Sequence, residues 1–135
     1  MRTFKEYTNN RPVLGVIETI VVDGVGEVLA KIDSGNEAHN VLHGVDIQYN
    51  GDSITFNTIN NKQLTLQKTG EIDINIGSGN IEKRPTVSLN FELKNQPYRD
   101  ITFSIADRAD NEQQVLIGEP FIRKINALID VKIEN

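Results

Sequence analysis

The chain contains no cysteine and no tryptophan, and it has no long apolar run. Without cysteine there is no disulfide framework, no thiolate metal site and no cysteine nucleophile. No segment approaches the roughly 20 apolar residues that a membrane-spanning helix needs. Residues Met1 to Glu6 also lack the apolar core of a secretory signal peptide. We therefore expect a protein that is not secreted and has no membrane partner.

Blocks of basic residues are missing as well. The net charge is −5, and acidic and basic residues are interspersed along the chain. Surfaces that bind nucleic acid or lipid normally show clustered Lys and Arg, so we expect no nucleic-acid partner. The length of 135 residues suits one domain with one core. The hydrophobic share of 38% fits a small core or a subunit interface.

Short β-prone segments separated by turn residues cover nearly the whole chain. Pro12 to Val22 and Gly26 to Asp33 flank the turn Asp23-Gly24, and this pattern predicts a hairpin. Alternating apolar residues predict further strands at 54–59, 63–67, 72–76, 87–93 and 99–106. Many short strands with frequent turns are typical of a small barrel or sandwich.

Only one segment resembles a helix. Glu119 to Ile125 follows Gly118 and has room for about two turns, and Pro120 suits a first helical turn because its missing N–H does no harm there. No domain boundary or low-complexity tract interrupts the chain. We predict a single all-β domain over residues 1–135 with this short helix near the C-terminus, in which residues 1–10 could form an N-terminal arm.

The tripeptide Asp33-Ser34-Gly35 follows the second predicted strand directly. An Asp-Ser/Thr-Gly just past a buried strand is how pepsin-type proteases present a catalytic carboxylate. A lone tripeptide of common residues is more simply interpreted as a polar turn. Two later apolar segments, Leu116-Ile117-Gly118 and Leu128-Ile129-Asp130, make the catalytic interpretation worth pursuing because of their order along the chain.

The ordered segments resemble those of one known group. Ala30 to Gly35 with Val41-Leu42-His43 resembles the Ala-Lys-Val-Asp-Thr-Gly and Ala-Leu-His segments of the so-called ATP-dependent zinc protease family, which is retropepsin-like despite its name. The similarity runs from Ala30 to Val131. The other matching segments are 83–87 (Lys-Arg-Pro-Thr-Val), 102–108 (Thr-Phe-Ser-Ile-Ala-Asp-Arg), 116–118 (Leu-Ile-Gly) and 128–130 (Leu-Ile-Asp).

This resemblance implies a retropepsin-like fold, a small closed β-barrel that corresponds to one half of an acid protease. It places Asp33 at the position of the catalytic aspartate, Ser34 at a hydrogen bond across a twofold axis, and Gly35 where the backbone must approach the carboxylates. Since one domain supplies one aspartate, the active enzyme would be a homodimer. The implied function is an aspartic endopeptidase (a hydrolase) with a peptide substrate and no cofactor.

The sequence departs from the family pattern at two places. Asn36-Glu37-Ala38 stands where the family has Ala-Arg-Thr, and Glu119 stands where an Arg follows Leu-Leu-Gly. Glu37 and Glu119 then need other positively charged partners, for which Arg123 and Lys124 are the candidates. These departures leave open a non-catalytic alternative, a virion or capsid structural or assembly protein built on the same barrel. Either function predicts a homo-oligomer located in the cytoplasm or a virion; a binding barrel without catalysis is a third, weaker alternative.

Other candidate site residues carry weaker signals. His39 and His43 are four apart, but the segment lacks the His-Glu-x-x-His pattern of a zinc site, so no metal is predicted. Gly77-Ser78-Gly79 lacks the Lys-Ser/Thr and helix of a phosphate-binding loop. Asp107 and Arg108 are expected to form an ion pair at a strand end, with an interface contact as the alternative.

Asp130 and the segment from Gln48 to Lys68 are the remaining candidates for parts of a retropepsin. Asp130 lacks a following Ser/Thr-Gly, so a structural role is expected rather than a second catalytic one. A retropepsin also needs a hairpin that closes over its substrate. We predict this hairpin within Gln48 to Lys68, although an ordinary surface hairpin would account for the same pattern.

Overall fold

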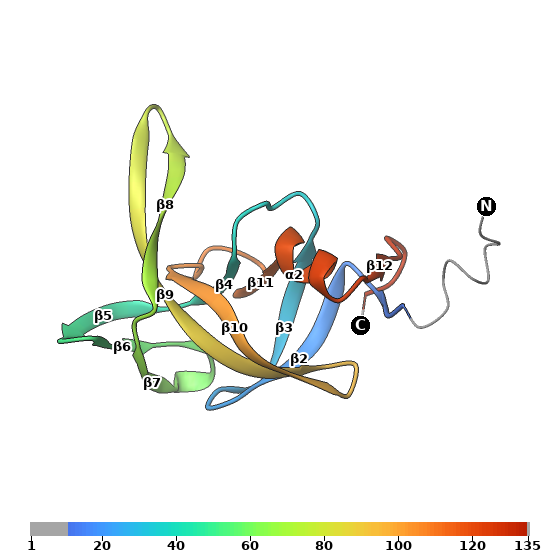
Figure 1. Cartoon of the computed structure of the whole chain (residues 1–135), viewed down its shortest axis with the longest axis horizontal. Helices are drawn as coiled ribbons and strands as arrows, with labels where there is room; N and C mark the ends of the chain where they lie inside the picture. Colours follow the sequence, from blue (N-terminus) through green and yellow to red (C-terminus); the bar gives the residue numbers. More distant parts are fainter. Residues whose placement is uncertain (1–10, 135) are drawn as a thin grey trace.

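The computed structural model describes residues 11–134, and within them the protein is built from strands, one 3₁₀ turn and one short α-helix (Figure 1). The predicted all-β class is confirmed, whereas the predicted arm at residues 1–10 lies outside the described residues. No helix in the described part is long and apolar enough to cross a membrane. The elements are β1 (Val13–Leu14), β2 (Ile17–Val22), β3 (Gly26–Asp33), β4 (Asn40–His43), β5 (Val45–Asn50), β6 (Ser53–Asn57), η1 (Ile59–Asn61), β7 (Gln63–Gln67), β8 (Gly70–Gly77), β9 (Asn80–Leu93), β10 (Gln96–Ala106), β11 (Val115–Gly118), α2 (Glu119–Lys124) and β12 (Leu128–Ile129).

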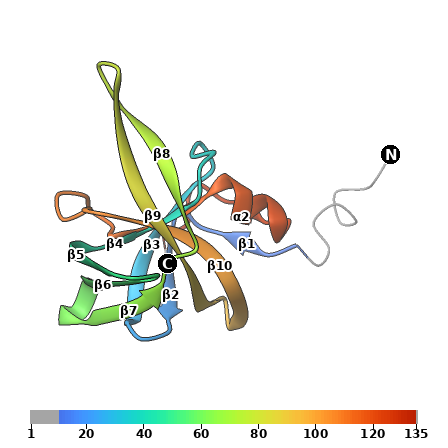
Figure 2. The ribbon, with the colours of Figure 1, turned by 60° about the vertical axis from the view of Figure 1, so that its left-hand side comes forward.

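Seven strands form the largest sheet, in the order β10-β4-β11-β3-β2-β9-β8. Because β10 also pairs with β9, the hydrogen-bonded order of six of these strands returns to its starting point. The seventh strand, β8, continues the sheet as a hairpin with β9 that stands out from the body (Figures 1 and 2). A three-stranded sheet, β5-β6-β7, and the parallel pair β1 and β12 complete the fold.

The prediction of one strand from Pro12 to Val22 is wrong in one respect, because the strand is interrupted at Gly15 and the segment forms two strands, β1 and β2. The Gly15 N–H donates to the buried Glu18 carboxylate at 2.6 Å. A Cβ at Gly15 would lie 2.3 Å from the Ile133 carbonyl oxygen. The break therefore turns β1 toward β12, a pairing between distant segments that local sequence does not reveal. The hairpin of β2 and β3 and the helix near the C-terminus are confirmed.

The core lies inside the ring of paired strands, and the alternation of the strands explains how it forms. In β2 and β3 every second residue is buried, as expected where one face of a sheet packs inward. Four aromatic side chains pack together where helix α2 meets the sheet, with neighbouring ring centroids 5.1–5.8 Å apart: Phe91, Tyr98, Phe103 and Phe121. This packing holds α2 against β9 and β10 through Phe121.

An ion pair stands at the base of the projecting hairpin. Lys68 pairs with Glu71 three residues later, and this hydrogen bond and charge hold the pKa of Glu71 below its ordinary value. A carboxyl group whose pKa is depressed by folding stabilises the fold above its unfolded pKa of about 4.3. That contribution is lost as the pH falls through the lower pKa of the folded state.

We predict that Lys68→Gln raises the pKa of Glu71, because the largest favourable partner of its charged form is removed. The pKa is measured by NMR titration of the Glu71 side-chain carboxyl carbon. Lys83→Gln is the matched control, since Lys83 lowers the pKa of Glu71 less than Lys68 does. Equal effects of the two substitutions would contradict the assignment of Lys68 as the dominant partner.

Candidate functional site

Asp33 is the last residue of β3, and it stands beside Gly118, the last residue of the parallel strand β11. Its side chain is partly buried, while Ser34 and Gly35 are exposed. The Gly35 N–H donates to Asp33 Oδ1 at 3.1 Å, so the loop orients its own carboxylate. The predicted loop thus presents one oriented acid at the protein surface.

The end of β11 lies directly beneath this loop. The Glu119 N–H donates to the Asn36 carbonyl at 2.8 Å. A Cβ at Gly118 would lie 2.9 Å from the Ala38 carbonyl oxygen and 3.1 Å from that of Asn36. Because a methyl group does not fit there, glycine is what lets the loop rest on β11. The apolar residues before Gly118 run parallel to the strand that carries Asp33.

Asn40 holds the far end of the loop, and the sequence reasoning missed it. Its buried side chain accepts a hydrogen bond from the Gly118 N–H through Oδ1 at 2.8 Å, and it donates through Nδ2 to the Thr102 carbonyl at 3.2 Å. One amide thus joins the loop to β11 and β10 together. The available signal was a lone amide at the start of an apolar segment, but its partners are 62 and 78 residues away.

We predict that Asn40→Leu lowers the free energy of unfolding by about 1–3 kcal/mol, because the buried Gly118 N–H would lose its acceptor without gaining another. Urea denaturation followed by circular dichroism measures the change. Gln67→Leu, an amide-to-leucine change at an exposed position of β7, is the control and should stay within about 0.5 kcal/mol. An Asn40→Leu protein as stable as the control would show that the hydrogen bonds do not hold the loop.

Arg108 lies within electrostatic range of both Asp33 and Arg84. Burial lowers the pKa of Arg108 and the charge of Arg84 lowers it further, whereas the charge of Asp33 raises it. Arg84, on β9, is paired with Glu82 at 2.9 Å. Arg108 donates from Nε to the Gln113 carbonyl at 3.2 Å. A cationic influence on Asp33 therefore comes from Arg108, in the loop after β10.

The prediction of an ion pair between Asp107 and Arg108 is wrong, because these two side chains do not pair with each other in the described part of the chain. Instead, Asp107 accepts the Ala109 N–H at 2.9 Å and lies 3.7 Å from His43 Nδ1. The Arg108 backbone N–H donates to the same His43 nitrogen at 2.9 Å. A loop that turns back over a buried histidine separates the two charges, which a strand-end interpretation did not anticipate.

The other candidate residues take structural positions. Glu119 pairs with Arg123 at 2.5 Å, one of the two partners suggested by the sequence. Asp130 is exposed and accepts the Lys132 N–H at 3.0 Å. His43 lies in β4 and His39 in the preceding loop, so they do not share a helix face. Residues 11–134 contain no group of three or more His, Cys, Asp or Glu that could hold a metal ion.

The segment in which the closing hairpin was predicted forms a small sheet, whereas a different hairpin projects from the body. The region from Gln48 to Lys68 forms parts of β5, β6 and β7, and Ile54 and Phe56 are fully buried in the core, which anchors it. The hairpin that stands out from the body is β8 and β9, and it rises on the same side as the Asp33 loop in both views (Figures 1 and 2). Near its tip, Ile76 and Ile81 are 57% and 66% exposed.

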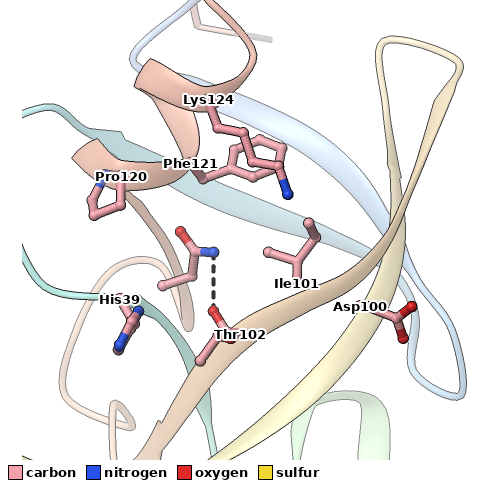
Figure 3. A pocket seen from close by; sticks show the side chains of 8 residues that line it. His39, Asp100, Ile101, Thr102, Pro120, Phe121 and Lys124 are labelled. Carbon is pink, nitrogen blue, oxygen red and sulfur yellow. Dashed lines mark hydrogen bonds between the residues drawn. The ribbon is translucent and has the colours of Figure 1, made fainter.

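A small hollow of about 170 Å³ lies between α2 and β10 (Figure 3). Phe121 and Ile101 give it an apolar wall, Lys124 reaches across it, and the hydrogen bond from Asn40 to Thr102 runs along one side. Pockets for small molecules usually enclose about 300–1,000 Å³. Because the hollow is smaller and borders the Asn40 hydrogen bonds, we assign it no ligand.

Comparison with known proteins supports the fold alone. No protein-family model and no curated protein matches the chain. A crystal structure from Legionella pneumophila, of a protein of unknown function (DUF785), is similar with a TM-score of 0.75 and 23% sequence identity. The similarity covers 91% of this chain and 95% of that one. The two proteins therefore share an architecture over nearly their whole lengths.

Proposed function

We propose that the protein is a retropepsin-like aspartic endopeptidase that acts as a homodimer, with one Asp33 from each copy. The observation that carries this proposal is the position of Asp33 on a loop that rests on Gly118 of the parallel strand β11. An acid needed only for a polar turn would not require so close an approach of a second strand. The partial burial of Asp33 and the hydrogen bond that its carboxylate accepts from Gly35 add to this support.

The strand arrangement supports a retropepsin-like barrel. Six strands pair in a closed order, one short helix follows β11, and the hairpin of β8 and β9 projects beside the Asp33 loop. A projecting hairpin of this kind would cover a bound peptide and exclude water from the reacting groups. We therefore assign the covering role to β8 and β9 in place of the region from Gln48 to Lys68.

The proposed chemistry needs two carboxyl groups about 3 Å apart that share one proton. Two carboxyl groups at that distance do not both ionise, because the two negative charges would repel each other, so one Asp33 stays protonated. The ionised Asp33 takes a proton from water, and the water oxygen attacks the carbonyl carbon of the peptide bond. The protonated Asp33 donates to the carbonyl oxygen. A proton then passes to the leaving nitrogen as the C–N bond breaks, and an acid and an amine are released.

The exposed part of the loop suits contact with a second copy. Ser34 is exposed next to Asp33, where its hydroxyl would hydrogen-bond across the twofold axis and hold the two loops together. Gly35 is exposed as well, and it already orients its own Asp33. Placing Ser34 and Gly35 against their symmetry mates would bring the two acids together, which makes the homodimer part of the proposed site.

We predict that Asp33→Asn abolishes cleavage of a quenched fluorescent peptide library, since the amide can neither share the proton nor activate water. Asp130→Asn, which removes an exposed acid outside the site, should retain the wild-type rate. A statine-containing peptide should inhibit the wild type, because it resembles the tetrahedral transition state.

Equal cleavage by wild type and Asp33→Asn would contradict this mechanism. A wild-type protein that cleaves nothing but still self-associates would favour the alternative role as a structural or assembly protein. Circular dichroism of both variants checks that a lost rate does not come from unfolding.

A further inference from the structure

Two strand edges without a partner face a common groove on the side of the molecule that carries β5. The first edge belongs to β5, the outer strand of the sheet β5-β6-β7. Within residues 11–134, β5 pairs with β6 alone, so its other edge retains unpaired backbone groups. Strand edges of this kind are sites where an extended chain is readily added.

The second edge belongs to β9. Its first half pairs with β8, and its second half also pairs with β10, beginning at Thr86 opposite Ser104. Phe103 and Ser104 pair with β9 along one edge of β10 and with β4 along the other, and beyond Ser104 only the pairing with β4 continues. Residues 82–85 of β9 therefore pair with β8 alone. This free edge arises because the pairing of β9 with β10 ends at Thr86, whereas β9 itself extends back to Asn80.

A groove of about 420 Å³ separates the two edges. Figure 1 shows β5 beside the base of the projecting hairpin, and Figure 2 shows the same neighbourhood after rotation. Buried Ile105 and Ala106 of β10 contribute an apolar end, and Tyr49, 58% exposed, stands at the rim. The groove is lined by Gly44 to Ile47 and Tyr49 on one side, by Glu82 to Pro85 on the other, and by Ile105 to Asp107 at its end.

We propose that this groove binds an extended peptide that carries Lys or Arg, through strand addition to the edges of β5 and β9. Each edge offers main-chain groups to an added strand, although the bulge between Val45 and Gln48 interrupts the edge of β5 and Pro85 supplies no N–H on the edge of β9. Asp33 does not line the groove. The proposal therefore does not rest on the proposed peptidase function, and the occupant is a separate partner that presents an extended basic segment.

Charge complementarity indicates a basic peptide. The two cations of the groove are already neutralised, since Arg84 pairs with Glu82 at 2.9 Å and Lys83 with Asp73 at 3.5 Å. Two carboxylates, those of Asp46 and Asp107, have no Lys or Arg partner within residues 11–134. Asp46 accepts from the Asn57 amide at 3.2 Å, and Asp107 accepts the Ala109 N–H and lies 3.7 Å from the His43 ring. The groove thus keeps acceptors for two positive charges.

The test uses a fluorescein-labelled hexapeptide, Thr-Lys-Val-Lys-Val-Thr, whose alternation suits a strand with both lysines on one face. Its affinity for the full chain is measured by fluorescence anisotropy, and its position by amide NMR shifts. Two comparison peptides carry Glu in place of Lys, or N-methyl groups on alternate backbone nitrogens. We expect the Lys peptide to bind at least about tenfold more tightly than either, with shifts centred on residues 45–49 and 82–85.

Matched variants separate the groove from general charge. Asp46→Asn combined with Asp107→Asn should weaken binding of the Lys peptide by about tenfold, as two exposed ion pairs of up to 1 kcal/mol each allow. Asp52→Asn combined with Asp110→Asn removes the same charge outside the groove lining and should leave the affinity unchanged. Asp33→Asn should bind like the wild type, which separates this proposal from the peptidase.

Three results would overturn the proposal. One is no binding of the Lys peptide at about 1 mM, a concentration that detects even weak complexes. Another is equal affinity for the Lys, Glu and N-methylated peptides, which would exclude both charge and strand pairing. The last is a set of NMR shifts that lies away from β5 and β9.

Discussion

The close contact between the Asp33 loop and the end of β11 is the constraint on which the rest of the site depends. Gly118 allows this contact because no Cβ fits beneath the Ala38 and Asn36 carbonyls. Asn40 then ties the loop to β11 and β10 through one buried amide. A carboxylate held in this way has a defined direction, which a catalytic acid needs and an ordinary surface turn does not. The proposed peptidase function follows from that rigidity more than from the tripeptide itself.

Local patterns predicted much of this fold correctly. The all-β class, the hairpin of β2 and β3, and the helix after Gly118 all came from alternation and turn residues. The pattern also placed Asp33 at a strand end, where the structure has it. These features depend on neighbouring residues, so one sequence is enough to find them.

The errors arose where distant segments decide the structure. Only 87–93 was predicted as a strand, but β9 begins at Asn80. Its first half is polar and contains Pro85, so it has no alternating apolar signal, and it is a strand because β8 pairs with it. The projecting hairpin of β8 and β9 was therefore not anticipated from the sequence. Asn40 was missed for a related reason, since its hydrogen-bond partners are remote in sequence.

The charges around Asp33 connect the site to the rest of the molecule. Arg84 comes from the same strand that lines the groove beside β5, and Arg108 follows Asp107 at the end of that groove. His43 accepts the Arg108 backbone N–H and so holds this loop on β4. Arg84 lines the groove and acts electrostatically on Arg108, which in turn interacts with Asp33, so the two proposed sites are linked through Arg108 although Asp33 does not line the groove.

The central claim is that two Asp33 loops meet across a twofold axis, and cysteine cross-linking tests it most directly. Because the chain has no cysteine, Ser34→Cys introduces a single thiol beside Asp33, and Thr65→Cys places one at an exposed position of β7, on the opposite side of the molecule from the Asp33 loop, as a control. Mild oxidation at low protein concentration should convert Ser34→Cys into a disulfide-linked dimer, since the account places the two loops in contact. A Ser34→Cys protein that stays monomeric, or that cross-links no faster than Thr65→Cys, would contradict the account.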